Sequence, residues 1–222
     1  MSRVGILGSL FHPPHMGHLR LAETATTFLA LDTLLFVPTA FPPHKSFNDL
    51  WGYEVRVFLT KIAFCLEPPE ELEISAQKLG KFPPTSLASL LAVYRRFYHP
   101  CPGWKLWEAE KEKTKPAYTI DTLKKYKLDH PEDEIFLLIG QDEAAVFHTW
   151  KRYEEIFSLA QVCVGTRPHA AEFPDMPFVK LPPFEVDVSS TKVREAWLKG
   201  ENLSGLVPET VQVALESLAT NR

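Results

Sequence analysis

The chain of 222 residues has the composition of an ordinary globular protein, with 45% hydrophobic and 23% charged residues. Its formal net charge of −4 argues against a nucleic-acid polymer as the main partner, although a small phosphorylated ligand needs only a local group of cations. No apolar run approaches the roughly 20 residues of a membrane span, and no signal peptide precedes Val4, so we predict neither a membrane partner nor export. Three widely spaced cysteines, Cys65, Cys101 and Cys163, predict reduced thiols in a cytoplasmic protein.

The first forty residues predict a β-strand, a helix and a second β-strand. The apolar run Val4–Leu7 has the length of one buried strand, and a helix rich in Ala and Leu is expected from about residue 15 to residue 30. The second strand, Thr33–Val37, is ended by Pro38. A strand–helix–strand unit of this kind predicts two parallel strands, and its crossover is right-handed in nearly all proteins.

The loop between this strand and this helix, residues 8–18, combines small residues, prolines and three histidines. A strand–turn–helix arrangement directs backbone N–H groups and the positive end of the helix dipole towards the turn, where phosphate is the natural ligand. His15 and His18 lie three residues apart and share one face of the first helical turn. Two other interpretations stay open: a helix start without chemistry, and a zinc site formed by His12, His15 and His18. The loop is neither a Walker A motif nor a Rossmann Gly-x-Gly-x-x-Gly motif.

The four residues from His15 to His18 match the His-x-Gly-His signature of the nucleotidylyltransferase superfamily. The longer stretch from Phe11 to Leu19 resembles the bacterial nicotinate-nucleotide adenylyltransferases. Two positions depart from that family. Gly8-Ser9 stands where the family usually has Gly-Gly, and His12 stands where it usually has Asp.

The chain between the second strand and residue 115 predicts further helices and one strand. Apolar residues at helical spacing predict helices over Tyr53–Leu66 and Thr85–Tyr98, and a third strand is expected over Leu72–Ser75. Residues 68–115 exceed what the family pattern requires, so we interpret them as an insert or as part of a duplicated strand–loop–helix unit. The duplication rests on the similarity of residues 75–94 to residues 108–126, at an offset of 32 to 33 residues.

The remaining strands are predicted in the second half of the chain. They are expected at Glu134–Gly140, Ala160–Val164, Phe178–Leu181 and Glu185–Val188. Ser189 or Ser190 then caps a helix that ends near residue 199. A final amphipathic helix is expected over Pro208–Leu218.

The resemblance covers residues 3–66 and 116 to about 215, with the motifs in the order that the family has. It implies one nucleotidylyltransferase domain over residues 1–222, with a doubly wound, mostly parallel Rossmann-like α/β sheet and helices on both faces. The implied reaction transfers AMP from ATP to nicotinate mononucleotide, giving deamido-NAD and pyrophosphate in NAD biosynthesis, with Mg²⁺ as cofactor. The alternatives are an adenylyltransferase for nicotinamide mononucleotide or phosphopantetheine, and a nucleotide-binding regulator without catalysis.

The resemblance also assigns the site residues. His15 and His18 are the catalytic pair that holds the phosphates of ATP. Other ATP contacts are expected in the first loop and in a Ser-Ser-Thr-x-x-Arg element, at Gly8, Ser9, Leu10, Ser189, Ser190, Thr191 and Arg194. Phosphate is also expected at Lys45 and Lys192. The nicotinate nucleotide is expected at His44, Tyr118, Thr119, Asp142 and Trp150, and Arg56 is expected to face the site.

Three of these places in the chain, one of them a pair of residues, also suit the chemistry on their own. Tyr118-Thr119 enters a helix whose N–H groups suit a carboxylate. Asp142, just beyond a buried strand, suits a ribose hydroxyl or a hydrated Mg²⁺, and Trp150 offers a flat face for a pyridine ring. Without the resemblance they would be a capped helix start, an N-cap and a core residue.

Overall fold

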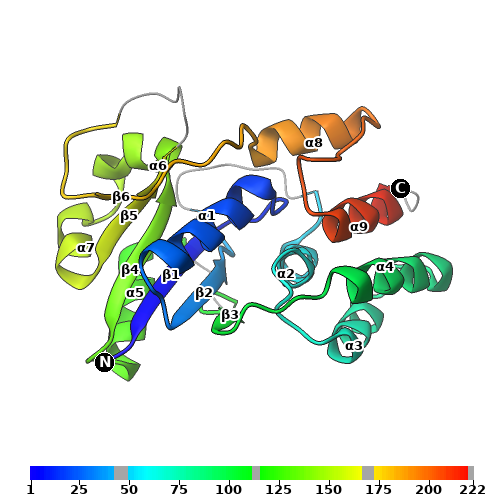
Figure 1. The fold of residues 1–222 in the computed structure, drawn as a ribbon, viewed down its shortest axis with the longest axis horizontal. Helices are drawn as coiled ribbons and strands as arrows, with labels where there is room; N and C mark the ends of the chain where they lie inside the picture. The colour runs from blue at the N-terminus through cyan, green and yellow to red at the C-terminus, as the bar shows by residue number, and fades with distance from the viewer. Residues whose placement is uncertain (43–49, 112–115, 167–172, 220–222) are drawn as a thin grey trace. The chain divides into compact units, whose positions relative to one another are not determined.

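The computed structural model describes residues 1–42, 50–111, 116–166 and 173–219. Its central element is a six-stranded sheet with the strand order β3-β2-β1-β4-β5-β6 (Figure 1). The strands are β1 (Arg3–Ser9), β2 (Thr33–Pro38), β3 (Trp104–Leu106), β4 (Glu134–Gly140), β5 (Gln161–Gly165) and β6 (Val179–Lys180). β1 pairs in parallel with β2 and β4, and β5 pairs in parallel with β4 and β6. This is the strand order of a doubly wound sheet, so the predicted fold class is confirmed.

Helices connect and follow the strands. The α-helices are α1 (Met16–Phe28), α2 (Tyr53–Ala63), α3 (Pro69–Leu79), α4 (Pro84–Phe97), α5 (Thr119–Asp129), α6 (Gln141–Ala145), α7 (Tyr153–Leu159), α8 (Ser190–Leu198) and α9 (Glu209–Ala219). A single turn of 3₁₀ helix, η1, spans Phe147–Thr149. Within the described ranges, no helix has both the length and the apolar character needed to cross a membrane.

The chain folds into two compact units, and each unit is built from three separate segments. Unit 1 contains residues 1–10, 20–47 and 105–187, and therefore most of the sheet. Unit 2 contains residues 11–19, 48–104 and 188–222, and consists chiefly of helices. A single domain over residues 1–222 stays a prediction.

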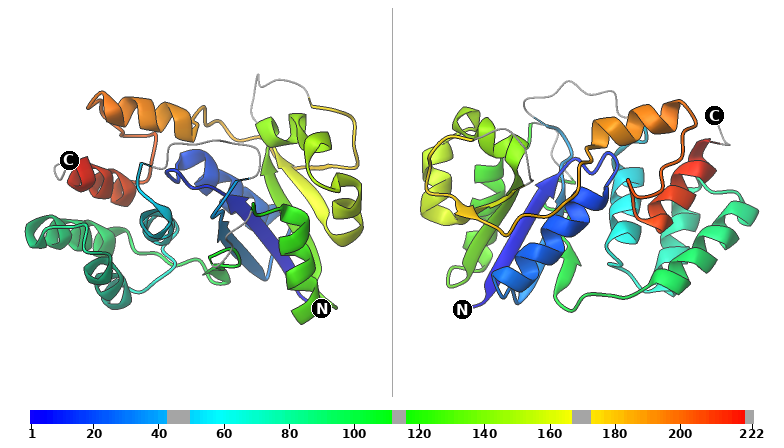
Figure 2. Two further views of the ribbon diagram at one scale, coloured as in Figure 1. Left: turned by 180° about the vertical axis from the view of Figure 1, so that it is seen from behind. Right: turned by 45° about the horizontal axis from the view of Figure 1, so that its top comes forward.

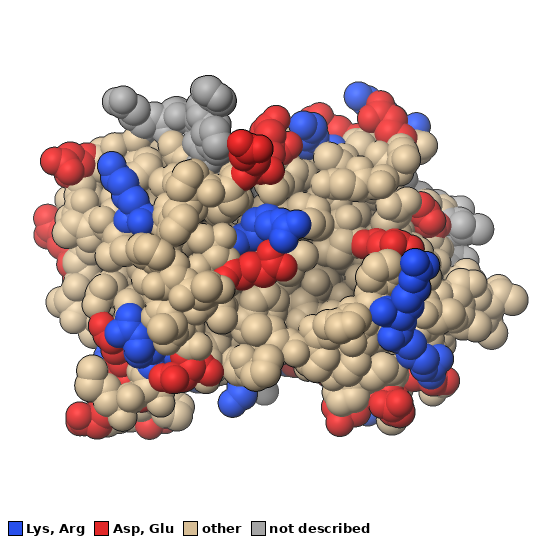
Figure 3. Space-filling model, viewed as in Figure 1, with Lys and Arg blue, Asp and Glu red and all other residues tan. Residues whose placement is uncertain are grey.

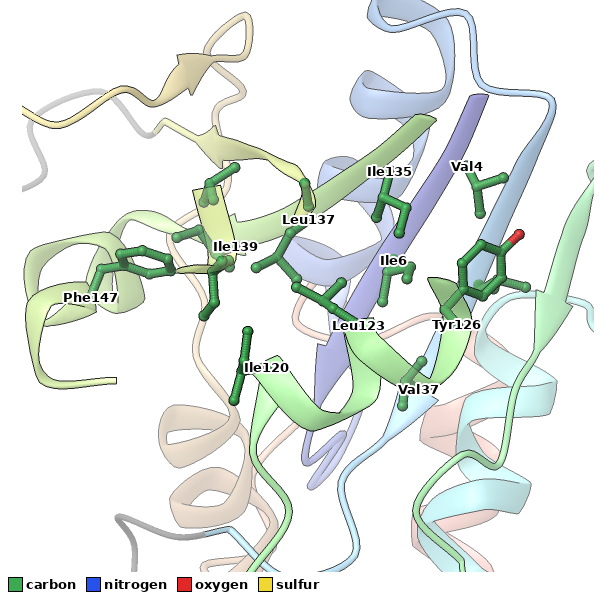
Figure 4. Close-up of a cluster of buried hydrophobic side chains, with 14 of the residues drawn as sticks. Val4, Ile6, Val37, Ile120, Leu123, Tyr126, Ile135, Leu137, Ile139 and Phe147 are labelled. Atoms are coloured by element: carbon green, nitrogen blue, oxygen red, sulfur yellow. The ribbon is translucent and has the colours of Figure 1, made fainter. Parts of the chain in front are cut away.

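In unit 1 the sheet is covered on both faces. α1 lies on one face (Figure 1), and α5 and α7 lie on the other, which Figure 2 shows from behind. The side chains of β1 alternate accordingly: Val4 and Ile6 belong to a hydrophobic cluster that includes Leu123 of α5 (Figure 4). Because both faces are buried, β1 and β4 are nearly continuous apolar runs in the sequence, which is why both were predictable.

Most predicted elements are confirmed within a few residues. The strands expected from the sequence correspond to β1, β2, β4, β5 and β6, and the expected helices correspond to α1, α2, α4, α5, α8 and α9. The strand predicted over Leu72–Ser75 is wrong, because these residues lie in α3. Leu72 and Ala76, one helical turn apart, are its buried residues, and Gly80 ends the helix in the left-handed conformation.

The strand predicted over Glu185–Val188 is also wrong. This segment carries no strand or helix hydrogen-bonding pattern in the described structure and leads from β6 into α8. Pro182 and Pro183 precede it, and proline cannot donate to a strand ladder. In contrast, β3 was not predicted, because its three residues are too few to give a periodic pattern.

The two stretches that suggested a duplication have different structures. Residues 75–78 lie inside α3, whereas residues 108–111 form a turn after β3. Only the helices that follow, α4 and α5, are comparable. The local sequence similarity therefore does not reflect a repeated strand–loop–helix unit among the described residues.

Side-chain hydrogen bonds connect the helices of unit 2. The hydroxyl of Thr210 in α9 donates to the carbonyl oxygen of Ile62 in α2 at 3.0 Å. The indole N–H of Trp197 in α8 donates to the carbonyl oxygen of Leu215 in α9 at 2.9 Å. α9 is thus the element to which both α2 and α8 are attached.

Charged side chains are dispersed on the face of the molecule that Figure 3 shows. Lys and Arg side chains alternate there with Asp and Glu side chains among many uncharged residues. One short run of blue side chains is visible near the right edge of this face, with red side chains next to it.

Asp133 anchors the N-terminus of unit 1 to the turn before β4. Its Oδ1 accepts the N–H of Ser2 at 2.9 Å, and its Oδ2 accepts the hydroxyl of Tyr126 at 3.0 Å. The hydrogen bond from Ser2 holds the pKa of Asp133 below its ordinary value of 3.8, because it stabilises the charged carboxylate. Burial and the hydrogen bond to Asp133 raise the pKa of Tyr126 to about 12, so the phenol stays protonated.

We expect the melting temperature of Asp133→Asn to depend less on pH in acid than that of the wild type. A carboxylate whose pKa is lowered by folding stabilises the folded state above its unfolded pKa, and this contribution disappears as the pH falls through the folded pKa. The melting temperature of the wild type should therefore drop more steeply below about pH 4 than that of the variant. Thermal unfolding between pH 7 and pH 2.5 tests this, with the exposed Asp129→Asn as control. Parallel profiles for Asp133→Asn and the wild type would contradict the assignment.

Candidate active site

The loop that follows β1 turns sharply at Phe11. The φ angle of Phe11 is 46°, a conformation that costs a residue with a side chain roughly 1–3 kcal/mol. Its ring is fully buried and packs edge-to-face on His18, with 5.1 Å between ring centroids, and on Phe64 at 5.7 Å. This packing stabilises the turn, so the histidines of the loop project from a fixed backbone.

Backbone N–H groups orient the rings of His15 and His18. The N–H of Gly17 donates to Nδ1 of His15 at 3.1 Å, and the N–H of His15 donates to Nδ1 of His18 at 3.3 Å. A ring nitrogen that accepts a hydrogen bond carries no proton, so the proton of each neutral ring is on Nε2. The ring centroids are 3.8 Å apart. The loop therefore holds two neighbouring Nε2–H donors, which are groups that bind phosphate oxygens.

Gly17 makes this arrangement of His15 possible. A Cβ atom added at position 17 would lie 3.0 Å from both Cε1 and Nδ1 of His15, and 3.5 Å from a methyl group of Val188. The first two separations are tighter than normal packing allows. The glycine of the His-x-Gly-His motif thus leaves room for the ring of the first histidine.

We expect Gly17→Ala to lower turnover by roughly tenfold, because small displacements of a positioned group are costly. The new methyl group has to push the imidazole of His15 away from the N–H that orients it. Steady-state kinetics measure the effect, and thermal unfolding checks that the variant is folded. Unchanged turnover in a folded variant would show that the position of this ring is unimportant.

His12 is almost completely buried, with 1% of its surface exposed. The N–H of Leu50 donates to its Nε2 at 3.2 Å, and its ring packs edge-to-face on Trp51 at 4.9 Å between centroids. The zinc interpretation therefore loses Nε2 of His12 and Nδ1 of His15 as ligands, since both accept a backbone N–H. No group of three or more His, Cys, Asp or Glu side chains in the described part of the chain could hold a metal ion.

α8 begins with the capped turn that the sequence predicts. Ser189 is the N-cap residue, and its hydroxyl oxygen accepts the N–H of Lys192 at 3.2 Å. Thr191 and Lys192 are exposed in the first turn, at the positive end of the helix dipole. Nη2 of Arg194 donates to the hydroxyl oxygen of Thr191 at 3.0 Å. Burial lowers the pKa of Arg194 from its ordinary value of 12.5, and the guanidinium stays charged at neutral pH.

Two hydrogen bonds connect side chains of α8 to the histidine loop, and in both the acceptor is a main-chain carbonyl oxygen of the loop. The hydroxyl of Ser190 donates to the carbonyl oxygen of Pro13 at 3.0 Å. Nη1 of Arg194 donates to the carbonyl oxygen of His12 at 2.8 Å. Unit 2 therefore brings together the two segments that the sequence predicts to bind anions, although some 180 residues separate them in the chain.

In unit 1, the entrance to α5 has features that suit an anionic ligand. Tyr118 is the N-cap residue in an extended conformation, and its side chain makes no capping hydrogen bond in the described structure. The Nζ atom of Lys151 lies 4.1 Å from the centroid of the Tyr118 ring and 3.4 Å from Oδ2 of Asp121. A helix N-terminus and an ammonium group therefore lie beside Thr119, the first residue of the helix.

Trp150 and Tyr118 both pack, half-buried, against the hydrophobic cluster of unit 1. The ring of Trp150 lies 5.0 Å from that of Phe147 between centroids. Asp142 is exposed in the first turn of α6, directly after β4, and Gly8–Leu10 end β1 and open the following loop. β1 and β4 are adjacent at the point where the strand order reverses, and ligands of doubly wound sheets bind beyond the carboxyl ends of such strands.

Comparisons with known proteins identify the family of the chain. The sequence profile of the cytidylyltransferase-like family matches residues 6–196. A probable nicotinate-nucleotide adenylyltransferase of Shouchella clausii is 31% identical over 218 residues, which cover 97% of this chain and 95% of the relative. The chain belongs to the nicotinate-nucleotide adenylyltransferase family. The nicotinate-nucleotide adenylyltransferase of Bacillus subtilis is 29% identical over 218 residues, with 97% and 96% of the two chains covered.

Solved structures of the family share the fold. The nicotinic acid mononucleotide adenylyltransferase of Plasmodium falciparum, in complex with NaAD, superposes with a TM-score of 0.69 at 15% identity, covering 97% of this chain and 96% of that one. A putative nicotinate-nucleotide adenylyltransferase of Vibrio parahaemolyticus gives a TM-score of 0.63 at 19% identity, covering 97% and 99%.

The structure does not show three of the residues that the resemblance assigns to the site, His44, Lys45 and Arg56, at an exposed position. His44 and Lys45 lie outside the described residues. Arg56, expected to face the site, is fully buried in α2, with its guanidinium 5.4 Å from the ring centroid of Tyr53. Lys151 was not predicted as a site residue, although it directly follows Trp150, which was predicted to contact the ligand.

Proposed function

We propose that the chain transfers the AMP group of ATP to nicotinate mononucleotide, releasing pyrophosphate and forming deamido-NAD. The observation that carries this proposal is the junction in unit 2 between the histidine loop and the N-terminus of α8. Two Nε2–H donors, a helix N-terminus and the cations Lys192 and Arg194 belong to these two segments, which suits a polyphosphate. The names of the relatives supply the second substrate.

The reaction is an in-line displacement at phosphorus. A phosphate oxygen of the mononucleotide attacks the α-phosphorus of ATP, and the bond from that phosphorus to the oxygen bridging to the β-phosphate breaks. Both electrons of the broken bond leave with pyrophosphate, and no covalent intermediate with the protein forms. The contribution of the protein is positioning and stabilisation of negative charge.

His15 and His18 act as neutral hydrogen-bond donors in this mechanism. Their Nδ1 atoms accept backbone N–H groups, so a second proton on either ring would set two donors against each other. The Nε2–H groups bind ATP phosphate oxygens, and they bind more strongly as charge moves towards the leaving pyrophosphate. Lys192 and Arg194 supply the positive charge, together with Lys45.

The mononucleotide is held by unit 1. The N–H groups at the entrance to α5 and the hydroxyl of Thr119 bind the nicotinate carboxylate, while Trp150 stacks on the pyridine ring. Tyr118 and His44 complete this site, and Asp142 binds a ribose hydroxyl. On the ATP side, Gly8, Ser9 and Leu10 contact the nucleotide where β1 ends.

Nucleotidyltransferases of this family generally use a divalent metal ion. We infer that the ion is Mg²⁺, which would be held mainly by oxygen atoms of the substrate phosphates, because these are hard ligands of the kind that Mg²⁺ prefers. When bound, Mg²⁺ neutralises part of the phosphate charge. Cys65, Cys101 and Cys163 form no disulfide bond with one another, and we infer a reducing compartment such as the cytoplasm.

The test is pyrophosphate release from ATP in the presence of one candidate acceptor at a time. We expect release with nicotinate mononucleotide, slower release with nicotinamide mononucleotide and none with phosphopantetheine, and mass spectrometry should identify deamido-NAD as the product. ATP binding without pyrophosphate release from any acceptor would instead identify a regulator. Release with phosphopantetheine alone would identify a different adenylyltransferase.

A further inference from the structure

Glu110 is a buried carboxylate that the proposed mechanism does not use. It lies in the turn between β3 and α5, and only 5% of its surface is exposed. Glutamate is rarely buried unless its charge is compensated by specific partners. The partners of Glu110 therefore indicate what its burial achieves.

The two carboxylate oxygens of Glu110 accept hydrogen bonds from two different elements of unit 1. Oε2 accepts the backbone N–H of Ala40, two residues after the end of β2, at 3.3 Å. Oε1 accepts the hydroxyl of Thr122, in the first turns of α5, at 3.0 Å. Ala40 and Thr122 are themselves buried. One side chain thus connects the segment after β2 to the helix that opens with Tyr118-Thr119.

Two further hydrogen bonds join the same segments. The N–H of Ala117 donates to the carbonyl oxygen of Phe41 at 2.9 Å, directly before the entrance to α5. Nζ of Lys125 donates to the carbonyl oxygen of Ala109 at 3.4 Å, so α5 also contacts the turn that carries Glu110. Glu110 lies at the centre of this set of contacts, and it is the member whose charge is buried.

We propose that Glu110 is a positioning residue for the mononucleotide: it fixes the entrance to α5 against the segment after β2. The link to the mononucleotide rests on the function proposed above, in which Thr119 and its neighbouring N–H groups bind the nicotinate carboxylate. Removing Glu110 leaves the hydroxyl of Thr122 and the N–H of Ala40 without this acceptor, and the entrance to α5 loses its fixed position.

Glu110 and its partner Thr122 can be substituted separately. In Glu110→Gln the amide oxygen can accept from Ala40 while the amide NH₂ donates to the hydroxyl oxygen of Thr122, so both contacts survive without the charge. Glu110→Ala removes both contacts. Thr122→Val removes the hydroxyl at nearly constant volume, and Thr122→Ser retains it. The control in the same turn is Glu108→Ala, since that carboxylate pairs with Lys111 at 3.4 Å.

Kinetics should separate positioning from general stability. We expect Glu110→Ala and Thr122→Val to raise the KM for nicotinate mononucleotide by about tenfold, with the KM for ATP changed less than twofold. Glu110→Gln, Thr122→Ser and Glu108→Ala should stay within about threefold of the wild type. The double variant Glu110→Ala/Thr122→Val should be no worse than the poorer single variant, because Glu110→Ala already removes the contact that Thr122→Val removes.

Hydrogen exchange tests the positioning without any assay of function. In Glu110→Ala the amides of Ala40 and of residues 118–122 should exchange faster, while those of α9 should be unchanged. If the wild type neither binds nor turns over nicotinate mononucleotide, the proposed function fails, and the exchange rates still decide whether Glu110 fixes α5. Unchanged exchange at these amides, or an equal rise of the KM for both substrates, would overturn the proposal. If Glu110→Ala does not fold, the same measurements on Thr122→Val decide it.

Discussion

His18→Ala should lower turnover by roughly 10²–10³, the usual effect of removing one donor to developing negative charge. The Nδ1 atom of His18 is occupied by the N–H of His15, so its Nε2–H is the group that the substitution removes from the phosphates. Substrate affinity should change less than turnover, because the interaction is strongest in the transition state. Single-turnover and steady-state measurements of pyrophosphate release provide both quantities.

A glutamine at this position distinguishes two roles for His18. The side-chain amide of His18→Gln places a neutral N–H donor near the position of Nε2, so it should recover part of the lost turnover if the histidine acts as a neutral donor. If His18 acts through a positive charge, the glutamine variant should be as slow as the alanine variant. His99→Ala, which alters an exposed histidine of unit 2, serves as the control. Turnover close to that of the wild type in a folded His18→Ala protein would refute the mechanism.

Nicotinate mononucleotide should be preferred over nicotinamide mononucleotide by at least about tenfold in kcat/KM. The two substrates differ only by a carboxylate or an amide on the ring. In the proposed site at the entrance to α5, the ligand would meet N–H donors, a hydroxyl and the ammonium group of Lys151 beside Tyr118. An amide would direct its NH₂ at some of these donors, and each buried group left unsatisfied costs about 1–3 kcal/mol, which is roughly tenfold to a hundredfold in specificity.

Two variants test this explanation of specificity. Thr119→Val should reduce the preference for the acid, because it removes the hydroxyl donor. Trp150→Ala should weaken both substrates alike, because stacking on the pyridine ring does not depend on its substituent. The ratio of kcat/KM values for the two mononucleotides is the measurement, for the wild type and for each variant. Equal efficiency on both substrates in the wild type would show that the assignment of Tyr118-Thr119 is wrong, even if adenylyl transfer itself is observed.

The sheet was predictable from the sequence because most of its strands are buried on both faces. β4 is the clearest case, since Glu134–Gly140 is apolar nearly throughout. α3 was mistaken for a strand because Leu72 and Ile74 alternate with charged residues over a short window. The helical pattern appears only when Ala76 and the glycine that ends the helix are included.

The site was predictable where a motif is contiguous. The histidine loop and the Ser-Ser-Thr-x-x-Arg element could be named as candidate anion sites, and their binding of phosphate stays a prediction. Their contact within unit 2 is seen only in the folded structure. The carboxylate of Glu110 could not be selected in this way. Its partners, Ala40 and Thr122, lie 70 residues before it and 12 residues after it in the chain, and only the folded structure places them together.

The alternation of the two units along the chain has an evolutionary consequence. Three segments of unit 1 alternate with three segments of unit 2, so the chain passes between the units five times. Two of these passages come directly before the two segments that we propose to bind phosphate, at residues 10–11 and 187–188. Because neither unit is one contiguous stretch of the chain, neither could have been gained or exchanged by joining two genes end to end. New acceptor specificities in such a chain therefore have to arise by substitution inside existing segments, or by insertion between them.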